Sequence, residues 1–205
     1  MKKISLYGAG GHAFAAIELI NSLGEYQPNF VFDDQPKKDK ILDVAVKKYD
    51  TKDSAESLCI SIGDNTNRKN IALQYNVDYP SFVHKSVEIY PSVIIGKGTL
   101  VLPNAVLDAK VSIGGFCIIN NNATVSHNVV LEDFVHIAIQ AAIAGGVEIG
   151  EGTLIGAGSV ILPELKIGKW ATIGAGAIIT KDVPDYAVVY GNPAKIIRYN
   201  TINEF

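Results

Sequence analysis

Aliphatic side chains occupy every sixth position of this 205-residue chain from Val83 to Ile179. An α-helix repeats every 3.6 residues and a flat strand every two, so neither explains a period of six. That period is typical of a β-helix, in which short strands stack coil on coil. The seventeen positions are Val83, Ile89, Ile95, Val101, Leu107, Ile113, Ile119, Val125, Leu131, Ile137, Ile143, Ile149, Ile155, Ile161, Ile167, Ile173 and Ile179.

Each hexapeptide has the composition of a short strand followed by a corner. Two residues before each aliphatic position the side chain is small or β-branched, except at Leu165. Glycine recurs directly after the aliphatic position, where we expect it to supply turn geometry that a residue with a Cβ resists. Three hexapeptides close one triangular coil, so residues 18 apart are expected to stack. The glycines are Gly96, Gly114, Gly150, Gly156, Gly168 and Gly174.

Residues 1–80 lack this period and alternate between strand-like and helix-like segments, although the charged residues 35–57 show no clear pattern. The expected strands are 4–7, 30–32 and 58–62, and the expected helices are 13–23 and 65–75. Gly24 would end the first helix, and Asp64 or Asn65 could cap the second. The sequence therefore predicts an α/β half-Rossmann domain at 1–80, followed by an all-β parallel β-helix domain with a C-terminal extension at 81–205.

The turn Gly8-Ala9-Gly10-Gly11 follows the first strand and opens the first helix. In that context glycines let the backbone approach a diphosphate, whose charge the helix N-terminus attracts. Asp33 and Asp34 follow the second strand, where an acidic residue can bind a ribose hydroxyl or a base edge. The alternative is a plain turn that needs glycine for packing. Residues 1–80 leave no room for a second dinucleotide-binding half, which favours a nucleotide sugar over NAD.

Composition excludes several classes of function. A formal net charge of −3 and a pI of about 5.8 argue against nucleic-acid or acidic-membrane partners. Cys59 and Cys117 form no motif, which is typical of a reduced, cytoplasmic protein. The N-terminal apolar stretch is too short for a signal peptide, and no stretch reaches the roughly 18 apolar residues of a membrane span. We expect a cytoplasmic protein without stable membrane insertion.

His127 lies two residues after an aliphatic position, at a corner and outside the predicted core. Stacking by 18 residues places Gly145 one coil after it and Ala109 one coil before it, so the slot beside it lacks bulk. Polar residues are unusually dense over 120–128. Because histidine exchanges protons near neutral pH, His127 is the candidate general base. The alternative is an exposed corner histidine without a function.

His136 follows nine residues later, which is half of the stacking period. The two histidines therefore lie on different sides of one coil and could meet only across an interface between subunits. This predicts a ring-like homo-oligomer with sites between subunits. His84 is interpreted as structural. Since His84, His127 and His136 occupy unrelated registers, they do not converge as zinc ligands must, and no metal is expected.

Several motifs resemble a known group of enzymes. They are Gly8-Ala9-Gly10-Gly11-His12, Asp33-Asp34, Ile62-Gly63-Asp64-Asn65 with Arg68, Ala123-Thr124-Val125-Ser126-His127, Phe134-Val135-His136-Ile137-Ala138 and Gly191-Asn192-Pro193-Ala194-Lys195. Together with the hexapeptides, they are similar to the left-handed β-helix acyltransferases of the sialic acid O-acetyltransferase and nucleotide-aminosugar N-acetyltransferase family. The resemblance covers almost the whole chain.

This resemblance implies a homotrimer of left-handed β-helices, with acetyl-CoA as co-substrate in the groove between adjacent subunits. The N-terminal domain would hold the nucleotide part of the substrate. The residues that the pattern and the resemblance together make candidates for substrate binding are Gly10, Gly11, His12, Asp33, Asp34, Gly63 and Asn120. Those expected to contact acetyl-CoA are His136, Gly145, Ala157 and Ala175. His12 has an alternative interpretation as a partly exposed polar residue near a helix start.

Two positions depart from the family pattern. Asn128 directly follows the candidate base, where the best-known aminosugar enzymes have an acidic residue. A neutral partner can fix the ring but stabilises an imidazolium less than a carboxylate does. Asn128 is the candidate orienting residue, with Glu132 as the alternative. Phe14 stands where many relatives have a basic residue near the phosphate turn, which weakens the diphosphate prediction.

We therefore expect an acetyl-CoA-dependent N-acetyltransferase that acts on the amino group, at C4, of a nucleotide-linked amino sugar for surface glycan synthesis. His127 would take a proton as the amine attacks the thioester, and a backbone N–H such as that of Gly145 would donate to the oxyanion. The first alternative is an O-acetyltransferase acting on a sialic acid or another sugar. The others are a non-catalytic nucleotide-sugar-binding β-helix protein and, more remotely, a nicotinamide-dependent enzyme.

Overall fold

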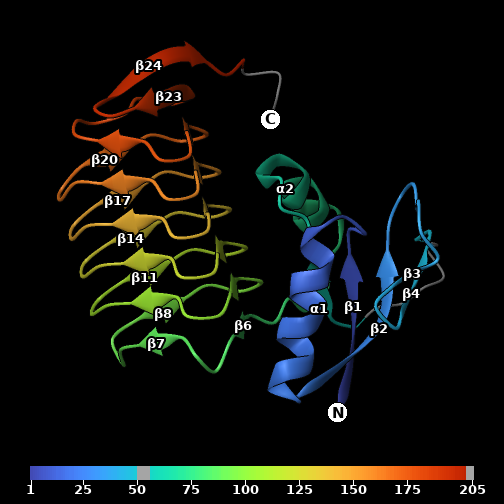
Figure 1. Ribbon diagram of the computed structural model, residues 1–205. Helices are drawn as coiled ribbons and strands as arrows, with labels where there is room; N and C mark the ends of the chain where they lie inside the picture. The colour runs from blue at the N-terminus through green and yellow to red at the C-terminus, as the bar shows by residue number, and fades with distance from the viewer. Residues whose placement is uncertain (50–55, 202–205) are drawn as a thin grey trace.

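The computed structural model describes residues 1–49 and 56–201, which form two units that lie side by side (Figure 1). The first is an α/β unit and the second is a three-sided parallel β-helix, as the two sequence patterns predict. Residues 50–55, and residues 202–205 at the end of the predicted C-terminal extension, lie outside the described part of the chain.

The α/β unit is built around a mostly parallel sheet. Its elements are β1 (Lys2–Tyr7), α1 (His12–Leu23), β2 (Tyr26–Phe32), β3 (Lys40–Ile41), β4 (Val44–Lys47), β5 (Leu58–Ile60) and α2 (Asn65–Gln74). The strand order is β3-β4-β2-β1-β5, and β1 pairs in parallel with both β2 and β5. Gly24 ends α1 in the left-handed conformation, and the Asp64 side chain caps α2. The segment without a clear period contains the antiparallel hairpin β3–β4.

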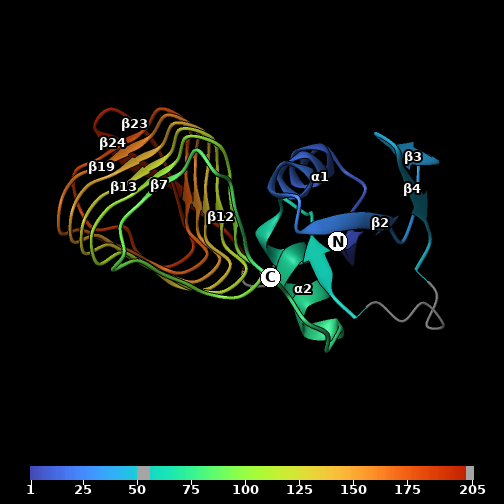
Figure 2. The same ribbon diagram turned by 90° about the horizontal axis from the view of Figure 1, so that it is seen from below.

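The β-helix consists of short strands that stack in three sheets, among the described residues, around a triangular outline (Figure 2). The β12 sheet contains β6 (Phe82–Val83), β9 (Leu100–Val101), β12 (Ile118–Ile119), β15 (His136–Ile137), β18 (Leu154–Ile155), β21 (Thr172–Ile173), β23 (Ala187–Gly191) and β24 (Ala194–Tyr199). The β13 sheet contains β7 (Glu88–Ile89), β10 (Val106–Leu107), β13 (Thr124–Val125), β16 (Ala142–Ile143), β19 (Val160–Ile161) and β22 (Ile178–Ile179). The β14 sheet contains β8 (Ile94–Ile95), β11 (Ser112–Ile113), β14 (Val130–Leu131), β17 (Glu148–Ile149) and β20 (Lys166–Ile167).

Strands of the β-helix pair in parallel with the strand 18 residues further along, which confirms the predicted stacking period. Leu107 pairs with Val125, for example, and Val125 pairs with Ile143. From Val101 onward the periodic aliphatic side chains fill the inside of the coil, with at most 3% of their surface exposed. Ile89 is 40% exposed, because no full coil precedes it. The periodic positions therefore form one continuous core.

The glycines that follow the aliphatic positions have a different role from the one predicted. The left-handed turn residue stands two positions later, and it is often not glycine, as at Asn128 with φ 60° and Glu164 with φ 61°. Gly96 and Gly150 have no left-handed φ, but a Cβ on either would lie 2.5–2.7 Å from backbone nitrogen of the next coil. These glycines are therefore required by the close approach of stacked coils rather than by turn geometry.

Two corners of the β-helix contain candidate site residues. The β13/β14 corner joins the sheets of those names and includes residues 126–128, 144–146 and 162–164 on successive coils. The β12/β13 corner includes residues 138–140, 156–158 and 174–176. Because each sheet stacks in register, a residue at a corner lies directly above the residue 18 positions earlier.

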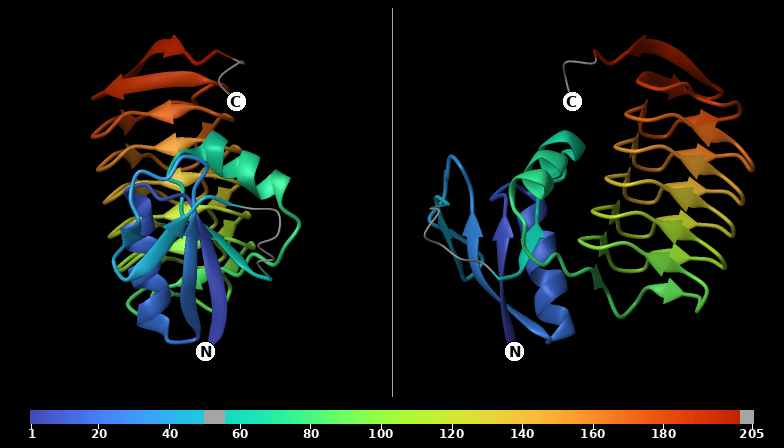
Figure 3. Two further views of the ribbon diagram at one scale, coloured as in Figure 1. Left: turned by 90° about the vertical axis from the view of Figure 1, so that its right-hand side faces the viewer. Right: turned by 180° about the vertical axis from the view of Figure 1, so that it is seen from behind.

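The α/β unit packs with α1 and α2 against the β12 side of the β-helix (Figures 2 and 3). Phe82, Leu100 and Leu102 of the first coils join α1 in one hydrophobic core. Arg68 on α2 has 1% of its surface exposed and donates from Nε to the Phe116 carbonyl at 2.7 Å. This docking fixes the loop that follows β5 onto the β-helix. No helix in the described residues has the length and apolar character needed to cross a membrane.

Candidate active site

A cavity of about 590 Å³ opens where β1, β2 and β5 end, between α1 and α2. Parallel α/β folds bind ligands at this edge of the sheet. The predicted substrate residues that line the cavity are Gly10, Gly11, His12, Asp33, Asp34 and Gly63. Amide side chains add neutral hydrogen-bonding groups, and these belong to Gln35, Asn67, Asn70 and Gln74. The arrangement suits a polar ligand with several donors and acceptors.

The two aspartates that follow β2 have separate roles. Asp33 Oδ2 accepts from the Ala9 backbone N–H at 2.8 Å, and Asp33 Oδ1 accepts from the Gln35 backbone N–H at 2.9 Å. Asp33 therefore anchors the glycine turn. Asp34 Oδ1 accepts from the Tyr7 hydroxyl at 2.6 Å. Burial, followed by the hydrogen bond to Asp34, raises the pKa of Tyr7 above its usual range, so this hydroxyl stays a donor.

The glycine turn is open toward the cavity. A Cβ built on Gly10 or Gly11 would meet nothing within 4 Å, whereas one on Gly8, with φ 106°, would lie against Ile62. Packing therefore explains Gly8 but not the other two. Gly11 makes no side-chain cap for α1, which leaves backbone N–H groups of the first turn for an anion. None of the described residues lining the cavity is a lysine or an arginine.

His136 lies at the junction of the two units, next to His12 and Asn120. Its Nδ1 donates to the Gly63 carbonyl at 3.3 Å, and its Nε2 accepts from Asn120 Nδ2 at 3.4 Å. The His12 and His136 rings are 6.5 Å apart between centroids. His12 Nε2 is buried and has no hydrogen-bond partner among the described residues. A buried nitrogen without a partner is uncommon in folded proteins.

Both of these histidines are neutral near pH 7. Burial is the largest cause, and the nearby Arg68 guanidinium adds to it. Together they lower the pKa of His12 to about 4 and the pKa of His136 to about 3. With both ring nitrogens engaged and a low pKa, His136 is a fixed hydrogen-bonding group rather than a free base.

His127 stands exposed on the β13/β14 corner with a fixed ring. Its Nδ1 is 3.1 Å from Asn128 Oδ1. Because an amide oxygen only accepts, Nδ1 carries the hydrogen and Nε2 keeps a free lone pair. The ring covers Gly145, where a Cβ would lie 2.7 Å from Nε2. A hollow of about 270 Å³ opens here, lined by His127, Asn128, Gly145, Gly146, Pro163 and Glu164.

The remaining predicted residues are distributed over different surfaces. His127 follows β13, while His136 lies in β15 of the β12 sheet, so the two are on separate sides of the coil as predicted. Ala157 and Ala175 are exposed on the β12/β13 corner, above one another. One protomer therefore does not bring together all the residues expected to contact acetyl-CoA.

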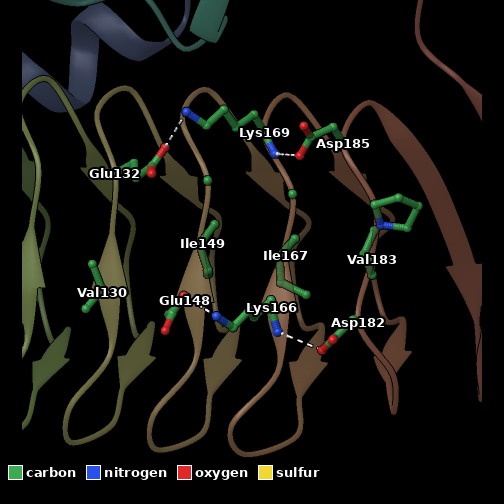
Figure 4. Close-up of a pocket in the computed structure, with 13 residues that line it drawn as sticks. Val130, Glu132, Glu148, Ile149, Lys166, Ile167, Lys169, Asp182, Val183 and Asp185 are labelled. Carbon is green, nitrogen blue, oxygen red and sulfur yellow. Dashed lines mark hydrogen bonds and ion pairs between the residues drawn. The ribbon is translucent and has the colours of Figure 1, made fainter.

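The structure places Glu132, the alternative partner that the sequence offers for His127, on another side of the β-helix. It accepts from the Glu151 backbone N–H at 2.9 Å and lies 3.4 Å from Lys169 Nζ. These contacts lie beside a hollow of about 500 Å³ on the β14 sheet, where Lys166 also pairs with Glu148 at 3.2 Å (Figure 4). Among the described residues, Asn128 rather than Glu132 is thus the side chain in contact with the His127 ring. Four carboxylates and two lysines line this hollow, and each lysine forms an ion pair with one of the two glutamates.

Residues 1–49 and 56–201 offer little support for a metal site or a cysteine nucleophile. No group of three or more His, Cys, Asp or Glu side chains there could hold a metal ion. Cys59 and Cys117 are buried. Burial raises the pKa of both thiols to about 12, so neither is available as a thiolate nucleophile near pH 7.

Comparison with known proteins agrees with this two-unit arrangement. The PglD N-terminal domain family matches residues 3–75, and the bacterial transferase hexapeptide family of six repeats matches 128–163 and 146–181. A variant of perosamine N-acetyltransferase from Caulobacter crescentus, solved with CoA and GDP-perosamine, is 30% identical with a TM-score of 0.90. The match covers 96% of this chain and 97% of that one. This chain belongs to the left-handed β-helix sugar acetyltransferases.

Other members of this acetyltransferase family match over nearly their whole length. The acetyltransferase domain of PglB from Neisseria gonorrhoeae FA1090, solved with acetyl coenzyme A, is 32% identical with a TM-score of 0.91. That match covers 96% of this chain and 99% of the other. WeeI from Acinetobacter baumannii AYE is 27% identical with a TM-score of 0.88, over 96% and 100% of the two chains. The predicted fold, a half-Rossmann unit followed by a left-handed parallel β-helix, is confirmed.

Sequence reasoning missed three functional features of this acetyltransferase fold. The carboxylate of Asp33 anchors the glycine turn, Arg68 joins the two units, and Glu164 lines the hollow of His127. The stacking period contained a signal for the last of these, since Glu164 follows Asn128 by twice 18 residues. The other two depend on how loops pack, for which the sequence has no periodic signal.

Proposed function

We propose that this protein is an acetyl-CoA-dependent N-acetyltransferase that acetylates the amino group, at C4, of a nucleotide-linked amino sugar. It would act in the cytoplasm for surface glycan synthesis. The observation that carries the proposal is the fixed imidazole of His127, whose free Nε2 lies over Gly145 in an open hollow. Support comes from family members whose solved structures contain CoA and GDP-perosamine.

The two units would divide the work. We assign residues 1–80 to binding the nucleotide sugar and residues 81–205 to acetyl transfer. In the cavity, the first turn of α1 would bind the diphosphate, and Asp34 and the amide side chains would bind the nucleoside. His12 and Asn120 would contact the sugar, since they lie between the cavity and the β-helix.

The active site would form between subunits of a homotrimer. The substrate cavity lies on the β12 side of a protomer, whereas His127 stands on the β13/β14 corner of the same protomer. If the β12/β13 corner of one subunit faces the β13/β14 corner of the next, Ala157 and Ala175 lie opposite Gly145. Acetyl-CoA would then lie between these corners and reach toward His136.

In the reaction, the neutral amine nitrogen attacks the thioester carbonyl carbon, and His127 Nε2 takes a proton from that nitrogen. The Gly145 backbone N–H donates to the oxyanion. When the tetrahedral intermediate collapses, the carbon–sulfur bond breaks and the sulfur receives a proton from the imidazolium. The products are the acetamido sugar and free CoA. A positioned base of this kind contributes on the order of 10²–10⁴ to the rate.

The test is a panel of UDP-, GDP- and dTDP-linked 4-amino sugars with acetyl-CoA, in which release of the CoA thiol is measured. We expect turnover with one nucleotide class and loss of turnover in His127→Ala. Absence of transfer to every amino sugar, or near wild-type turnover in His127→Ala, contradicts the proposed function.

A further inference from the structure

Asn128, Gly146 and Glu164 stand on three consecutive coils of the β13/β14 corner. The Gly146 N–H donates to the His127 carbonyl at 2.9 Å, and the Glu164 N–H donates to the Gly145 carbonyl at 3.0 Å. All three have left-handed φ, at 60°, 72° and 61°. Since Gly146 has no side chain, a gap separates the side chains of Asn128 and Glu164.

The side chains of His127 and Glu164 approach the Gly145–Gly146 coil from opposite directions. A Cβ on Gly145 would lie 2.7 Å from His127 Nε2, and a Cβ on Gly146 would lie 3.4 Å from Glu164 Cγ. Both side chains line the same hollow of about 270 Å³. An acceptor nitrogen bound near Nε2 would therefore have a carboxylate close by.

This carboxylate has no compensating cation among the described residues. No lysine, arginine or histidine there lies within ion-pair distance of Glu164, whereas Glu132, Glu148 and Glu151 each face a lysine (Figure 4 shows the first two). Glu164 is also the one acidic residue among the described residues that line the hollow. An unpaired carboxylate attracts an ammonium group far more strongly than a hydroxyl.

We propose that Glu164 selects an amine acceptor over a hydroxyl acceptor, by binding the sugar ammonium beside His127 before the transfer step. The inference rests on the proposed function. A sugar amine is largely protonated near pH 7, so the acceptor arrives with a positive charge. The bound ammonium releases one proton to solvent, and the neutral amine then attacks as described above. Glu164 itself forms no covalent bond, and its contribution is to the binding of the acceptor.

The test compares Glu164→Gln with Glu148→Gln, in the full-length protein with acetyl-CoA. Glu148 is a matched control, because its carboxylate pairs with Lys166 on the β14 sheet, away from the hollow of His127. Each variant is assayed with a nucleotide-linked 4-amino sugar as substrate, and the 4-hydroxy analogue is measured as a competitive inhibitor. We expect Glu164→Gln to raise KM for the amine about tenfold, with kcat within about twofold. The inhibition constant of the hydroxy analogue stays unchanged, and Glu164→Asp retains most of the amine preference.

The outcomes separate this inference from the proposed function. Glu148→Gln is expected to match wild type for both ligands, which excludes a general effect of net charge. If the amine KM in Glu164→Gln equals that of wild type, or if amine and hydroxy ligands weaken alike, the inference is wrong while the proposed function stands. If wild type acetylates no amino sugar, both are wrong.

Discussion

Gly145→Ala tests the geometry of the base without changing any side chain that reacts. Gly145 does not have a left-handed φ, so alanine fits the backbone. Its Cβ, however, would lie 2.7 Å from His127 Nε2 and 3.0 Å from Nδ1, where ordinary contacts need about 3.5 Å. The imidazole must therefore withdraw by about 1 Å. A misplacement of that size costs about 100-fold in rate, so we expect kcat to fall about 100-fold.

The assay follows CoA thiol release with saturating amino sugar and acetyl-CoA. His127 is exposed on a corner, so we expect the free energy of unfolding to change by about 0.5 kcal/mol or less. A double-mutant cycle supplies the control, because Gly145→Ala should have little further effect in the His127→Ala background. A fall in kcat of less than about twofold, or an equal fall in both backgrounds, refutes the reasoning.

The contacts of Asn128, His136 and Arg68 can each be tested by substitution. Asn128→Gly keeps the left-handed φ of 60° but removes the acceptor for His127 Nδ1, so kcat should fall at least about tenfold. Asn128→Asp keeps an acceptor and should keep activity. Equal rates in the two variants would contradict this prediction. Lowering pH from 7 to 5 should destabilise the fold, because burial and Arg68 lower the pKa of His136 to about 3 while the unfolded histidine accepts a proton near 6.5. His136 accounts for about 2 kcal/mol of that loss of unfolding free energy. Urea titrations at both pH values should therefore show a smaller loss in His136→Gln than in wild type. An unchanged loss in this variant would contradict the role assigned to His136. Arg68→Met leaves buried carbonyls without donors and should lower the free energy of unfolding by about 3–5 kcal/mol. The control Lys69→Met breaks a half-buried ion pair with Glu151 and should lower it by about 1 kcal/mol or less. Similar losses in the two variants would show that Arg68 does not hold the two units together.

Periodicity explains why much of the β-helix could be predicted from sequence. A coil that repeats every 18 residues places Gly145 beside His127. The structure confirms this, because the His127 ring lies directly against Gly145. The same period separates His127 from His136 by half a coil, so the two lie on different sides of the β-helix. Such relations follow from counting, because each strand pairs with the next coil in fixed register.

The other features of the site depend on contacts between residues that the six-residue period does not relate. Asp33 and Asp34 are neighbours in sequence, yet one anchors the glycine turn and the other accepts from Tyr7, because the loop directs their carboxylates differently. Arg68 acts across two units that are far apart along the chain. The glycines after the aliphatic positions were predicted for turn geometry, but close packing between coils requires them. Each of these features is set by three-dimensional packing, which a single sequence does not contain.

The central claim is that the active site combines the cavity of one subunit with His127 of another. Two variants test it by complementation: His127→Ala, and Gly11→Trp, whose side chain would obstruct the cavity. Each should be inactive alone. In a randomly mixed trimer, about a quarter of the sites would combine an intact cavity with an intact His127 from different subunits. The account therefore predicts recovery of about a quarter of wild-type activity on co-expression, and a mixture that stays inactive would contradict it.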